Sequence, residues 1–382
     1  MTIIQKQARI TYLTELKARY SFASKSEKQI MLDEFTKTTG YTRKHAIHLL
    51  RGIYRHKVEK IKRQRARIYT DLDAKILARI CDLFDWIASK RLQPQIAVGI
   101  TELQKAGELL FVTDAQKEKL IGISPSSIDR LLVSHHLRPT SKGRSYTKPG
   151  TLLKSQIPIR TFADWNENKV GFFEMDLVGH DGGNAKGVFA FTLNMTDVKT
   201  GWSEQVAVPN KGQHAVFTAI KIIRERIPFA LLGVDSDSGS EFINDILYRY
   251  CIQEKITFTR GRPGKKNDNP FVEQKNDSIV RRWVGYKRYE TVEQVKLLND
   301  LYTLLRLYTN FFLPVHKLQS KERIGSKVKK IYDKAKTPYQ RIIEAEYASE
   351  EVKSKLKEQY KLLCLVPLKK HIDSIVLKLI LV

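Results

Sequence analysis

The sequence predicts a multidomain protein: an all-α region, then an α/β core on a mixed sheet flanked by helices, then a basic and mainly helical region. Three observations predict this order. The length of 382 residues exceeds that of one typical domain. Apolar residues recur at helical spacing in the first third of the chain. From about residue 165, short β-rich runs separated by turns replace that pattern.

Basic residues are concentrated at both ends of the chain, which carries 67 Lys and Arg against 41 Asp and Glu. Residues 1–150 hold 29 basic and 14 acidic residues, residues 151–260 hold 12 and 13, and residues 261–382 hold 26 and 14. Two cationic flanks around a near-neutral middle favour a nucleic acid held on both sides of a reaction centre. The alternatives are a generally basic surface or a membrane-facing patch, but no amphipathic membrane helix stands out.

Membrane and disulfide classes are not favoured. No apolar run of about 18 residues is present, and the first ten residues lack the apolar stretch of a signal peptide, so we expect no membrane partner. The three cysteines, Cys81, Cys251 and Cys364, are isolated from one another. This predicts packing roles and a reducing compartment.

Residues 1–70 are expected to form a first helix-turn-helix unit with a basic segment. A helix, a turn around Gly40 and a second helix from Thr42 are expected. The inward-facing residues of the second helix would be Ala46, Leu49 and Leu50, and its outward, DNA-facing residues would be Arg43, Lys44, His45 and His48. The basic segment after it would follow a phosphate backbone through Arg63 and Arg65. A plain helical hairpin with a solvated basic face is the alternative.

Residues 71–137 are expected to form a second helix-turn-helix unit. Gly122 would make its turn, Ser124 would cap the second helix and Pro125 would be the first helical residue. The inner residues would be Ile128, Leu131 and Leu132, and the exposed DNA-binding residues would be Ser126, Ser127 and Arg130. Residues 138–160, rich in Pro, Gly, Ser and basic residues, predict a linker.

Residues 161–290 are expected to form the catalytic core. Its expected elements are a three-stranded meander (169–180, 187–198 and 201–209), a helix (211–228), a buried strand (229–237), a helix (240–256), a strand (256–263) and a helix (267–286). Asp268 or Asn269 would cap the last helix, with Pro270 at its first position. Residues 291–382 are expected to be basic and mainly helical. The closing stretch "SIVLKLILV" is either a packed strand or an altered terminus.

Three acids occupy suggestive positions in this core. Asp176 lies inside the first strand, Asp237 ends the fourth, and Glu273 lies in the first turns of a later helix. The first and fourth strands of such a sheet are commonly neighbours, so these carboxylates could converge. Clustered carboxylates suit Mg²⁺ or Mn²⁺. Two such ions about 4 Å apart stabilise the attacking and leaving oxygens of phosphoryl transfer.

Asp235 competes with Asp237 for the second position, because residues two apart on a strand face the same side. Asp237 is preferred because it directly precedes the glycine turn at the carboxyl end of the strand. Asp235 is expected to accept a hydrogen bond behind the site or to pair with a cation. Minor structural roles are expected for other polar residues: an exposed or sheet-edge Glu174, loop positions for His180, Asp181 and Asp197, and a cap-region position for His214.

The spacing and context of the three acids resemble a known family. Sixty residues separate Asp176 from Asp237 and 35 separate Asp237 from Glu273, within "DSGSEF" and "NDNPFVEQKN". Roughly residues 160–290 resemble the DD(35)E core of retroviral integrases, and still more that of bacterial insertion-sequence transposases. The resemblance implies an RNase H-like fold and Mg²⁺-dependent cleavage and transfer of DNA strands at element ends.

The resemblance also implies roles for individual residues. Asp176 would bridge two metal ions, Asp237 would complete one site and Glu273 the other. Gly239 would permit the turn after the strand, and Glu241 and Phe242 would begin the next helix. The DNA-binding residues near the Glu273 helix would be Lys265, Lys266, Asn267 and Arg281. Retroviral integrases carry an N-terminal His/Cys zinc module, but this chain has no matching cysteine pair, so no zinc is expected.

The resulting hypothesis is a DDE transposase that binds the terminal inverted repeats of a mobile element and integrates them into target DNA. It would act as a homo-oligomer on DNA and be cytoplasmic and nucleoid-associated in a bacterium. One alternative is a nuclease of the same fold that cuts without joining. The other is a domesticated DNA-binding regulator that uses only the helix-turn-helix units, although a regulator gains nothing from three buried acids.

Overall fold

The structure is a computed structural model that describes residues 6–52, 68–133, 157–158, 169–262, 269–325 and 327–382. The chain divides into two compact units, Met1–Ile68 and Tyr69–Val382. The predicted DNA contacts Arg63, Arg65, Lys265 and Lys266, and also Asn267 and Asp268, lie outside the described residues.

The described part of the first unit is a small bundle of three helices around its own core. The helices are α1 (Lys6–Phe22), α2 (Lys25–Thr39) and α3 (Arg43–Leu50). Gly40 ends α2 with a φ of 72°, a left-handed conformation that suits glycine. Ala46 and Leu50 are buried and Leu49 is half-buried. The predicted helix, glycine turn and inward-facing second helix are therefore confirmed.

The second unit begins with a group of helices: α4 (Asp71–Leu83), α5 (Ser89–Leu92), α6 (Ile96–Lys105), α7 (Asp114–Ile121) and α8 (Pro125–Leu132). The Ser124 side chain caps α8 by accepting from Ser127 N, and Pro125 is the first helical residue, as predicted. Ile128 and Leu132 are buried and Leu131 is half-buried. These helices share one hydrophobic core with the sheet that follows.

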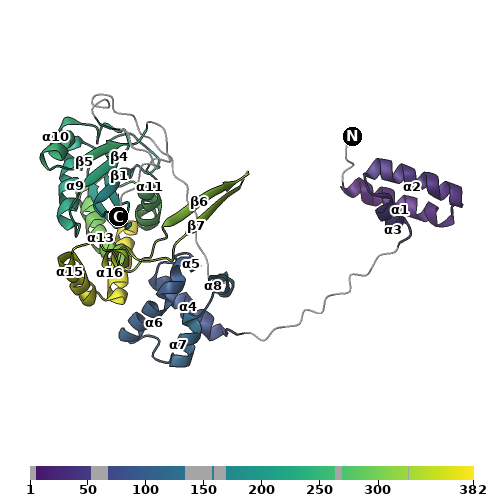
Figure 1. The fold of residues 1–382 in the computed structure, drawn as a ribbon, viewed down its shortest axis with the longest axis horizontal. Coiled ribbons are helices and arrows are strands. Elements are labelled where there is room, and N and C mark those ends of the chain that lie inside the picture. Colours follow the sequence, from purple (N-terminus) through teal and green to yellow (C-terminus); the bar gives the residue numbers. More distant parts are fainter. Residues whose placement is uncertain (1–5, 53–67, 134–156, 159–168, 263–268, 326) are drawn as a thin grey trace. The chain divides into compact units, whose positions relative to one another are not determined.

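A mixed five-stranded sheet forms the centre of the second unit (Figure 1). The strands are β1 (Phe172–Gly179), β2 (Phe191–Asp197), β3 (Ser203–Val208), β4 (Gly233–Ser236) and β5 (Thr257–Arg260), in the order β3-β2-β1-β4-β5. β1, β2 and β3 pair antiparallel, whereas β4 pairs parallel with both β1 and β5. The predicted meander and the predicted pairing of the first and fourth strands are confirmed.

The two faces of the sheet differ in polarity because successive side chains on a strand alternate. On β1, Phe173 and Met175 are fully buried among apolar residues, whereas Glu174 and Asp176 point to the opposite face. The helix α11 (Pro270–Lys275) packs against β1 and β2 and continues as a π-helix, η4 (Asn276–Arg281), and then as α12 (Arg282–Val284). The other helices of the core are α9 (Gln213–Arg226), α10 (Asp245–Gln253) and α13 (Val292–Phe311).

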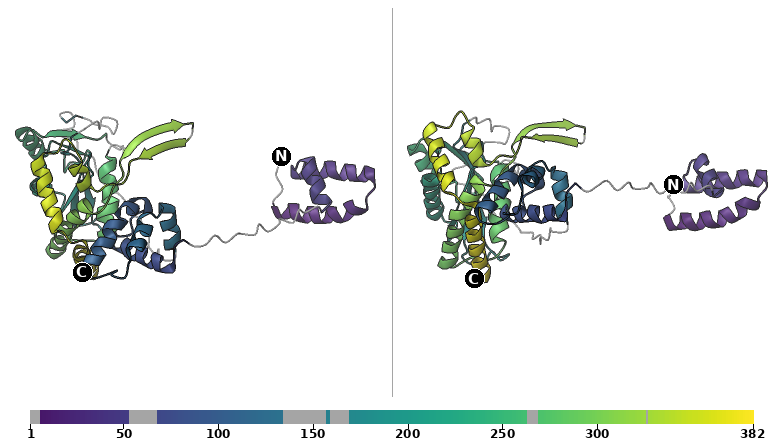
Figure 2. Two further views of the ribbon diagram at one scale, coloured as in Figure 1. Left: turned by 60° about the horizontal axis from the view of Figure 1, so that its bottom comes forward. Right: turned by 90° about the horizontal axis from the view of Figure 1, so that it is seen from below.

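One prediction about elements is wrong. Glu241 and Phe242 do not begin a helix, because residues 240–243 form turns and bends and α10 begins at Asp245 with Asn244 as its cap. The region after residue 290 is mainly helical, as predicted, but not throughout. It contains an antiparallel hairpin of β6 (Leu318–Ile324) and β7 (Lys327–Tyr332), which projects from the body of the second unit (Figures 1 and 2).

The C-terminal stretch is a helix, so the expectation of a packed strand is wrong. After α14 (Pro338–Ile343) and α15 (Glu350–Leu362), the chain ends in α16 (Leu365–Leu381), which packs against α13. Ile372, Ile375 and Leu379 are buried at helical spacing, which explains the apolar composition. Within the described residues, no helix is long and apolar enough to cross a membrane.

The cysteines confirm a packing role at two of three positions. Cys81 and Cys251 are buried, whereas Cys364 is exposed and precedes α16. Burial raises the pKa of both buried thiols to about 12, so they stay protonated at neutral pH.

Candidate active site

The first acid, Asp176, lies on β1 at the level where the parallel strand β4 ends. β1 and β4 are in register up to Met175 and Ser236, so Asp176 and Asp237 are the next residues on the two strands. Oδ1 of Asp176 accepts from its neighbour Leu177 N at 2.8 Å, and Oδ2 accepts from Asn276 Nδ2 at 2.7 Å. The predicted convergence of the first two acids follows from this register.

The second acid, Asp237, forms the turn that follows β4. Its Oδ1 accepts from Gly239 N at 3.0 Å. The side chain of Glu241 folds back over Gly239: a Cβ added at position 239 would lie 2.7 Å from the Glu241 carboxylate carbon and would displace this flexible side chain. Gly239 does not adopt a left-handed backbone conformation, so the turn itself does not require glycine there. Burial raises the pKa of Glu241, and the charge of Asp237 contributes in the same direction.

The third acid, Glu273, is exposed on α11, the helix that packs across β1 and β2. The other two acids both act on Asp176. Burial and then the charge of Asp237 raise the pKa of Asp176 to about 7, with a further contribution from Glu273. The bonds from Leu177 N and Asn276 oppose this rise. Burial also raises the pKa of Asp237, while the bond from Gly239 N and the charge of Lys211 oppose that rise. Asp237 and Glu273 thus lie near enough to Asp176 to disfavour its negative charge.

A chain of hydrogen-bonded side-chain amides ends at the Asp176 carboxylate and orients it. Gln205 Nε2 on β3 donates to Asn194 Oδ1 on β2 at 2.9 Å. Asn194 Nδ2 donates to Asn276 Oδ1 at 2.8 Å, and Asn276 in turn donates to Asp176. The sequence interpretation missed this chain. One feature of the sequence could have indicated a role for Asn276 at the site. It follows Glu273 by three residues, and residues three apart on a helix are neighbours.

Glu174 corrects the prediction of an exposed or sheet-edge residue. Its side chain is fully buried, and Oε2 accepts from Phe271 N at 2.7 Å and from Val272 N at 2.8 Å. Both N–H groups belong to the first turn of α11, where backbone donors have no partner within the helix. Asn269, the N-cap residue of α11, does not accept from them with its side chain. Burial raises the pKa of Glu174 well above its usual value, and Asp235 adds to the rise. Glu174 therefore fixes the start of the helix that carries Glu273.

Asp235 is fully buried on β4 and accepts a hydrogen bond from the hydroxyl of Thr259 on β5. It lies beside Glu174 in the strand register. This fits the expected position behind the site. His180 directly follows β1, as expected for a loop position, but its side chain is buried beside Thr192 at 2.7 Å. Asp197 is the last residue of β2 and not a loop residue as expected, and its carboxylate is buried with bonds from Gly171 N and Thr200. His214 lies exposed in the first turn of α9.

The described DNA-binding candidates are distributed over both units. Arg43, Lys44 and His48 are exposed on α3, where Arg43 pairs with Asp33 of α2. On α8, Ser126 and Arg130 are exposed and Ser127 is half-buried. Arg281 ends η4 and donates to Gly179 O at 2.8 Å, so it has a structural partner at the end of β1. Their contacts with DNA remain predictions.

The donor set of the site suits a hard cation. Its side chains are carboxylates, the ligands preferred by Mg²⁺ and Mn²⁺, and their mutual repulsion would be relieved by positive charge. In the part of the chain that the structure describes, no three His, Cys, Asp or Glu side chains stand in metal-binding geometry. Asp176 and Asp237 are instead turned to Asn276 and Gly239 N, respectively.

The fold and the acids define a class: an α/β protein with a helical N-terminal region, a mixed five-stranded sheet and carboxylates gathered where two parallel strands end. No protein-family model matches the chain. The uncharacterized protein y4rM of Sinorhizobium fredii is 38% identical over 316 residues, which are 82% of this chain and 89% of that protein. The chain belongs to the family of y4rM.

A comparison with solved structures finds the catalytic core domain of BIV integrase. The similarity covers 44% of this chain and 91% of that chain, with 17% sequence identity and a TM-score of 0.28. At this TM-score the likeness carries no weight for the activity of the chain.

Proposed function

We propose that the chain is a DDE-type DNA transposase that binds the ends of a mobile DNA element and catalyses strand cleavage and strand transfer. The observation that carries the proposal is the acid cluster. Asp176 lies on β1 beside the end of the parallel strand β4, with its pKa raised to about 7 by burial, by Asp237 and by Glu273. A carboxylate whose pKa is strongly raised by burial together with neighbouring carboxylates is a candidate for a functional site.

The arrangement of the core supports the proposal. The strand order β3-β2-β1-β4-β5, with an antiparallel meander followed by two parallel strands, suits the RNase H-like fold that the sequence resemblance implies. The acids occupy the positions that the resemblance assigns: the first strand, the end of the fourth strand and the helix that crosses the sheet. The intervals between them and the residues around them are those on which the resemblance rests.

Asp176, Asp237 and Glu273 would hold Mg²⁺ or Mn²⁺. When bound, such ions stabilise the charge that develops on the oxygens of a phosphodiester under attack. The carboxylates would have to turn toward each other from their present partners, Asn276 and Gly239. Zinc is not proposed, since the carboxylate set suits a harder ion.

The chain's own residues position these groups. Asn276 orients the Asp176 carboxylate, and Glu174 fixes the first turn of α11 and hence Glu273. In cleavage, a water oxygen forms a bond to the scissile phosphorus and the bond to the 3′ oxygen breaks, which leaves a 3′-hydroxyl. In joining, that hydroxyl attacks a target phosphodiester, so one phosphodiester bond replaces another and no external energy source is needed.

Recognition of the element ends is assigned to the helical parts of the chain. α3 exposes Lys44 and His48, and α8 exposes Ser126 and Arg130. Each of these helices follows a short turn after another helix and exposes polar side chains near its start, which supports a role in the major groove. Action on two ends at once would require a homo-oligomer on DNA, which we include in the proposal.

The test is a strand-joining assay with a duplex that carries a pre-cut element end and a target plasmid. The wild-type chain is expected to join them in Mg²⁺ or Mn²⁺ and to lose joining completely in excess EDTA, since the ions stabilise the transition state. Asp176→Asn is expected to be inactive while it still binds DNA. Cutting without joining would favour the nuclease alternative, and undiminished joining in EDTA would contradict the proposal.

A further inference from the structure

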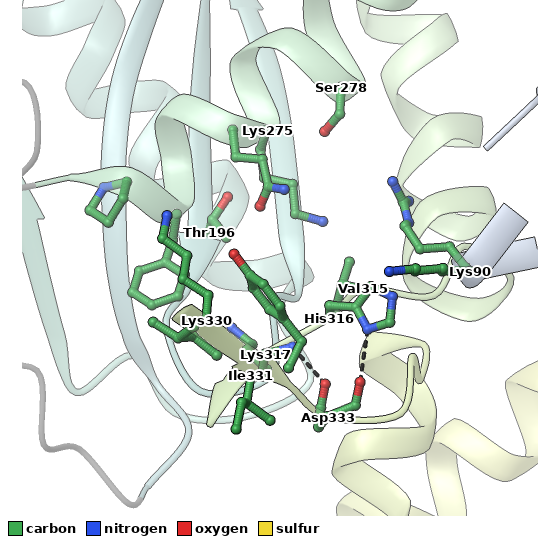
Figure 3. Close-up of a pocket in the computed structure, with 17 residues that line it drawn as sticks. Lys90, Thr196, Lys275, Ser278, Val315, His316, Lys317, Lys330, Ile331 and Asp333 are labelled. Atoms are coloured by element: carbon green, nitrogen blue, oxygen red, sulfur yellow. Dashed lines mark hydrogen bonds between the residues drawn. The ribbon is translucent and has the colours of Figure 1, made fainter. Parts of the chain in front are cut away.

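A cavity of about 830 Å³ lies against α11, and none of the three acids lines it. Its walls come from α5, from α11 and η4, from Thr196 on β2, and from the β6–β7 hairpin with the segments that flank it (Figure 3). The basic residues in its lining are Lys90, Arg91, Lys275, Lys317 and Lys330, which together define the cationic pocket.

The one acid in this lining is already neutralised. Asp333 Oδ1 accepts from Lys317 N at 2.7 Å, and Oδ2 forms an ion pair with Arg341 at 2.7 Å. Two of the basic side chains bond backbone carbonyls instead of an acid: Arg91 Nε donates to Pro314 O at 2.7 Å, and Lys317 Nζ donates to Val198 O at 2.6 Å. Asp197 and Glu174 also lie near enough to Lys317 for their charges to raise its pKa. Within the described residues, the uncompensated positive charge of the cationic pocket therefore rests on Lys90, Arg91, Lys275 and Lys330.

Lys275 is the most informative member of the pocket. Its exposed fraction is only 8%, and its side chain makes no hydrogen bond or ion pair within the described residues. A charge on so deeply buried a side chain is disfavoured without an anion beside it, even though the ammonium atom itself is not sealed from water. Lys90 and Lys330 are exposed and can reach a ligand that enters the cavity.

Aromatic residues accompany this charge. Phe271 and Tyr332 line the same cavity, the ammonium of Lys317 lies 4.6 Å from the ring centre of Phe271, and the Tyr332 side chain is 49% exposed. The volume is larger than one phosphate ion needs and can admit a nucleotide unit. Basic side chains for the backbone and an aromatic face for a base are the features with which proteins bind single nucleic-acid strands.

We propose that the cationic pocket binds a phosphate group of a DNA strand, with an adjacent base against Tyr332. The choice of DNA as the source of this phosphate rests on the proposed function. Pro270, Phe271, Gln274 and Lys275 line the pocket, and Glu273 belongs to the same short helix. A strand held in the pocket is therefore placed at a fixed position relative to Glu273.

The test measures the binding of a fluorescent single-stranded DNA of about 20 nucleotides to the full chain in EDTA, so that no catalysis occurs. Lys330→Ala and Lys275→Met are each expected to weaken binding about tenfold, the cost of one charge-assisted contact. The matched control is Lys329→Ala, which removes the same charge from the next residue of β7 but does not line the pocket. Its affinity is expected to stay within about twofold of wild type.

Three outcomes would overturn the pocket proposal. Equal losses for Lys329→Ala and Lys330→Ala would mean that only general surface charge matters. Thermal stabilisation by inorganic phosphate that DNA does not compete away would mean that the pocket takes a small free anion. If Lys275→Met does not fold, Lys330→Ala alone decides. The third outcome is a pocket variant that binds DNA as tightly as wild type in EDTA. If that variant also joins strands normally, the pocket proposal is wrong and the proposed transposase function still stands, because the binding assay does not depend on catalysis.

Discussion

Asp235 and Asp237 are two residues apart on one strand but occupy different environments. Asp235 is fully buried and accepts from Thr259, whereas Asp237 is half-buried at the turn beside Asp176. We predict that Asp237→Asn abolishes cleavage and joining without loss of DNA binding. Asp235→Asn is expected to retain measurable activity, with metal affinity lowered about tenfold or more, as for other residues behind a metal ligand.

The measurement is joining activity over a Mg²⁺ titration for both variants, with DNA binding measured in parallel. An active Asp237→Asn together with an inactive Asp235→Asn at saturating Mg²⁺ would reverse the assignment of the second acid.

Glu174 acts on the site through the backbone of α11. We predict that Glu174→Ala lowers strand joining about 10- to 100-fold, because Phe271 N and Val272 N lose their acceptor and Glu273 loses its position. Glu174→Gln keeps a carbonyl oxygen for these donors and is expected to retain most of the activity. The readouts are joining rate, Mg²⁺ dependence and DNA affinity, of which only the last should stay unchanged.

The two variants at position 174 separate two explanations. If Glu174→Gln were as impaired as Glu174→Ala, the negative charge of Glu174 would matter instead of its role as an acceptor, and the positioning role would be wrong.

At the scale of elements, Asp73 joins α4 to α7. Its buried carboxylate accepts from Thr70 N at 2.7 Å and pairs with Lys119 Nζ at 2.6 Å. Burial works to raise the pKa of Asp73, but the bonds from Lys119, Thr70 and Gln116 outweigh it and lower the pKa from 3.8 to about 2. The stabilisation is therefore complete above the unfolded pKa of 3.8 and is lost as the pH falls toward 2.

We predict that Asp73→Asn lowers the free energy of unfolding by about 1–2 kcal/mol near neutral pH, with a smaller difference below about pH 4. Chemical unfolding of the full chain at several pH values measures this. The matched control is Asp71→Asn, an exposed acid in the same first turn, which is expected to have a small effect. Equal destabilisation by both variants would contradict the role of Asp73.

The elements with a strong local signal could be predicted from the sequence. Alternating apolar runs marked β1, β2 and β3, and the Ser124–Pro125 pair marked the start of α8. The β6–β7 hairpin was missed because its strands are exposed and rich in Lys, so they lack the apolar alternation of a half-buried strand. The end of the chain was ambiguous because α16 carries apolar residues on most of its surface.

Within the site, the three acids could be predicted from the two intervals between them and from the residues around them, which match those of a known family. The buried state of Glu174 was not, because it depends on α11 starting above β1, about a hundred residues later in the chain. The amide chain from Gln205 to Asp176 is missed for the same reason: its members come from β3, β2 and η4. Contacts of this kind follow from the fold and leave no local pattern.

At the scale of the whole molecule, the charge pattern and the structure assign different tasks to different parts of the chain. The near-neutral middle contains the sheet and two of the acids, Asp176 and Asp237. The basic flanks contribute α3 in the first unit and α8, η4 and the cationic pocket in the second. A polyanion held by these flanks would lie against the carboxylates of Asp176 and Asp237, which repel it. A bound metal ion would offset this repulsion.

The most direct measurement of the central claim is binding of Mn²⁺ to the full chain, followed by electron paramagnetic resonance. The wild-type chain is expected to bind two ions close enough to couple magnetically, at about 4 Å. Asp176→Asn should abolish the coupling, and Asp235→Asn should retain it. Bound Mn²⁺ and magnetic coupling that are unchanged in Asp176→Asn would contradict a metal centre formed by Asp176, Asp237 and Glu273.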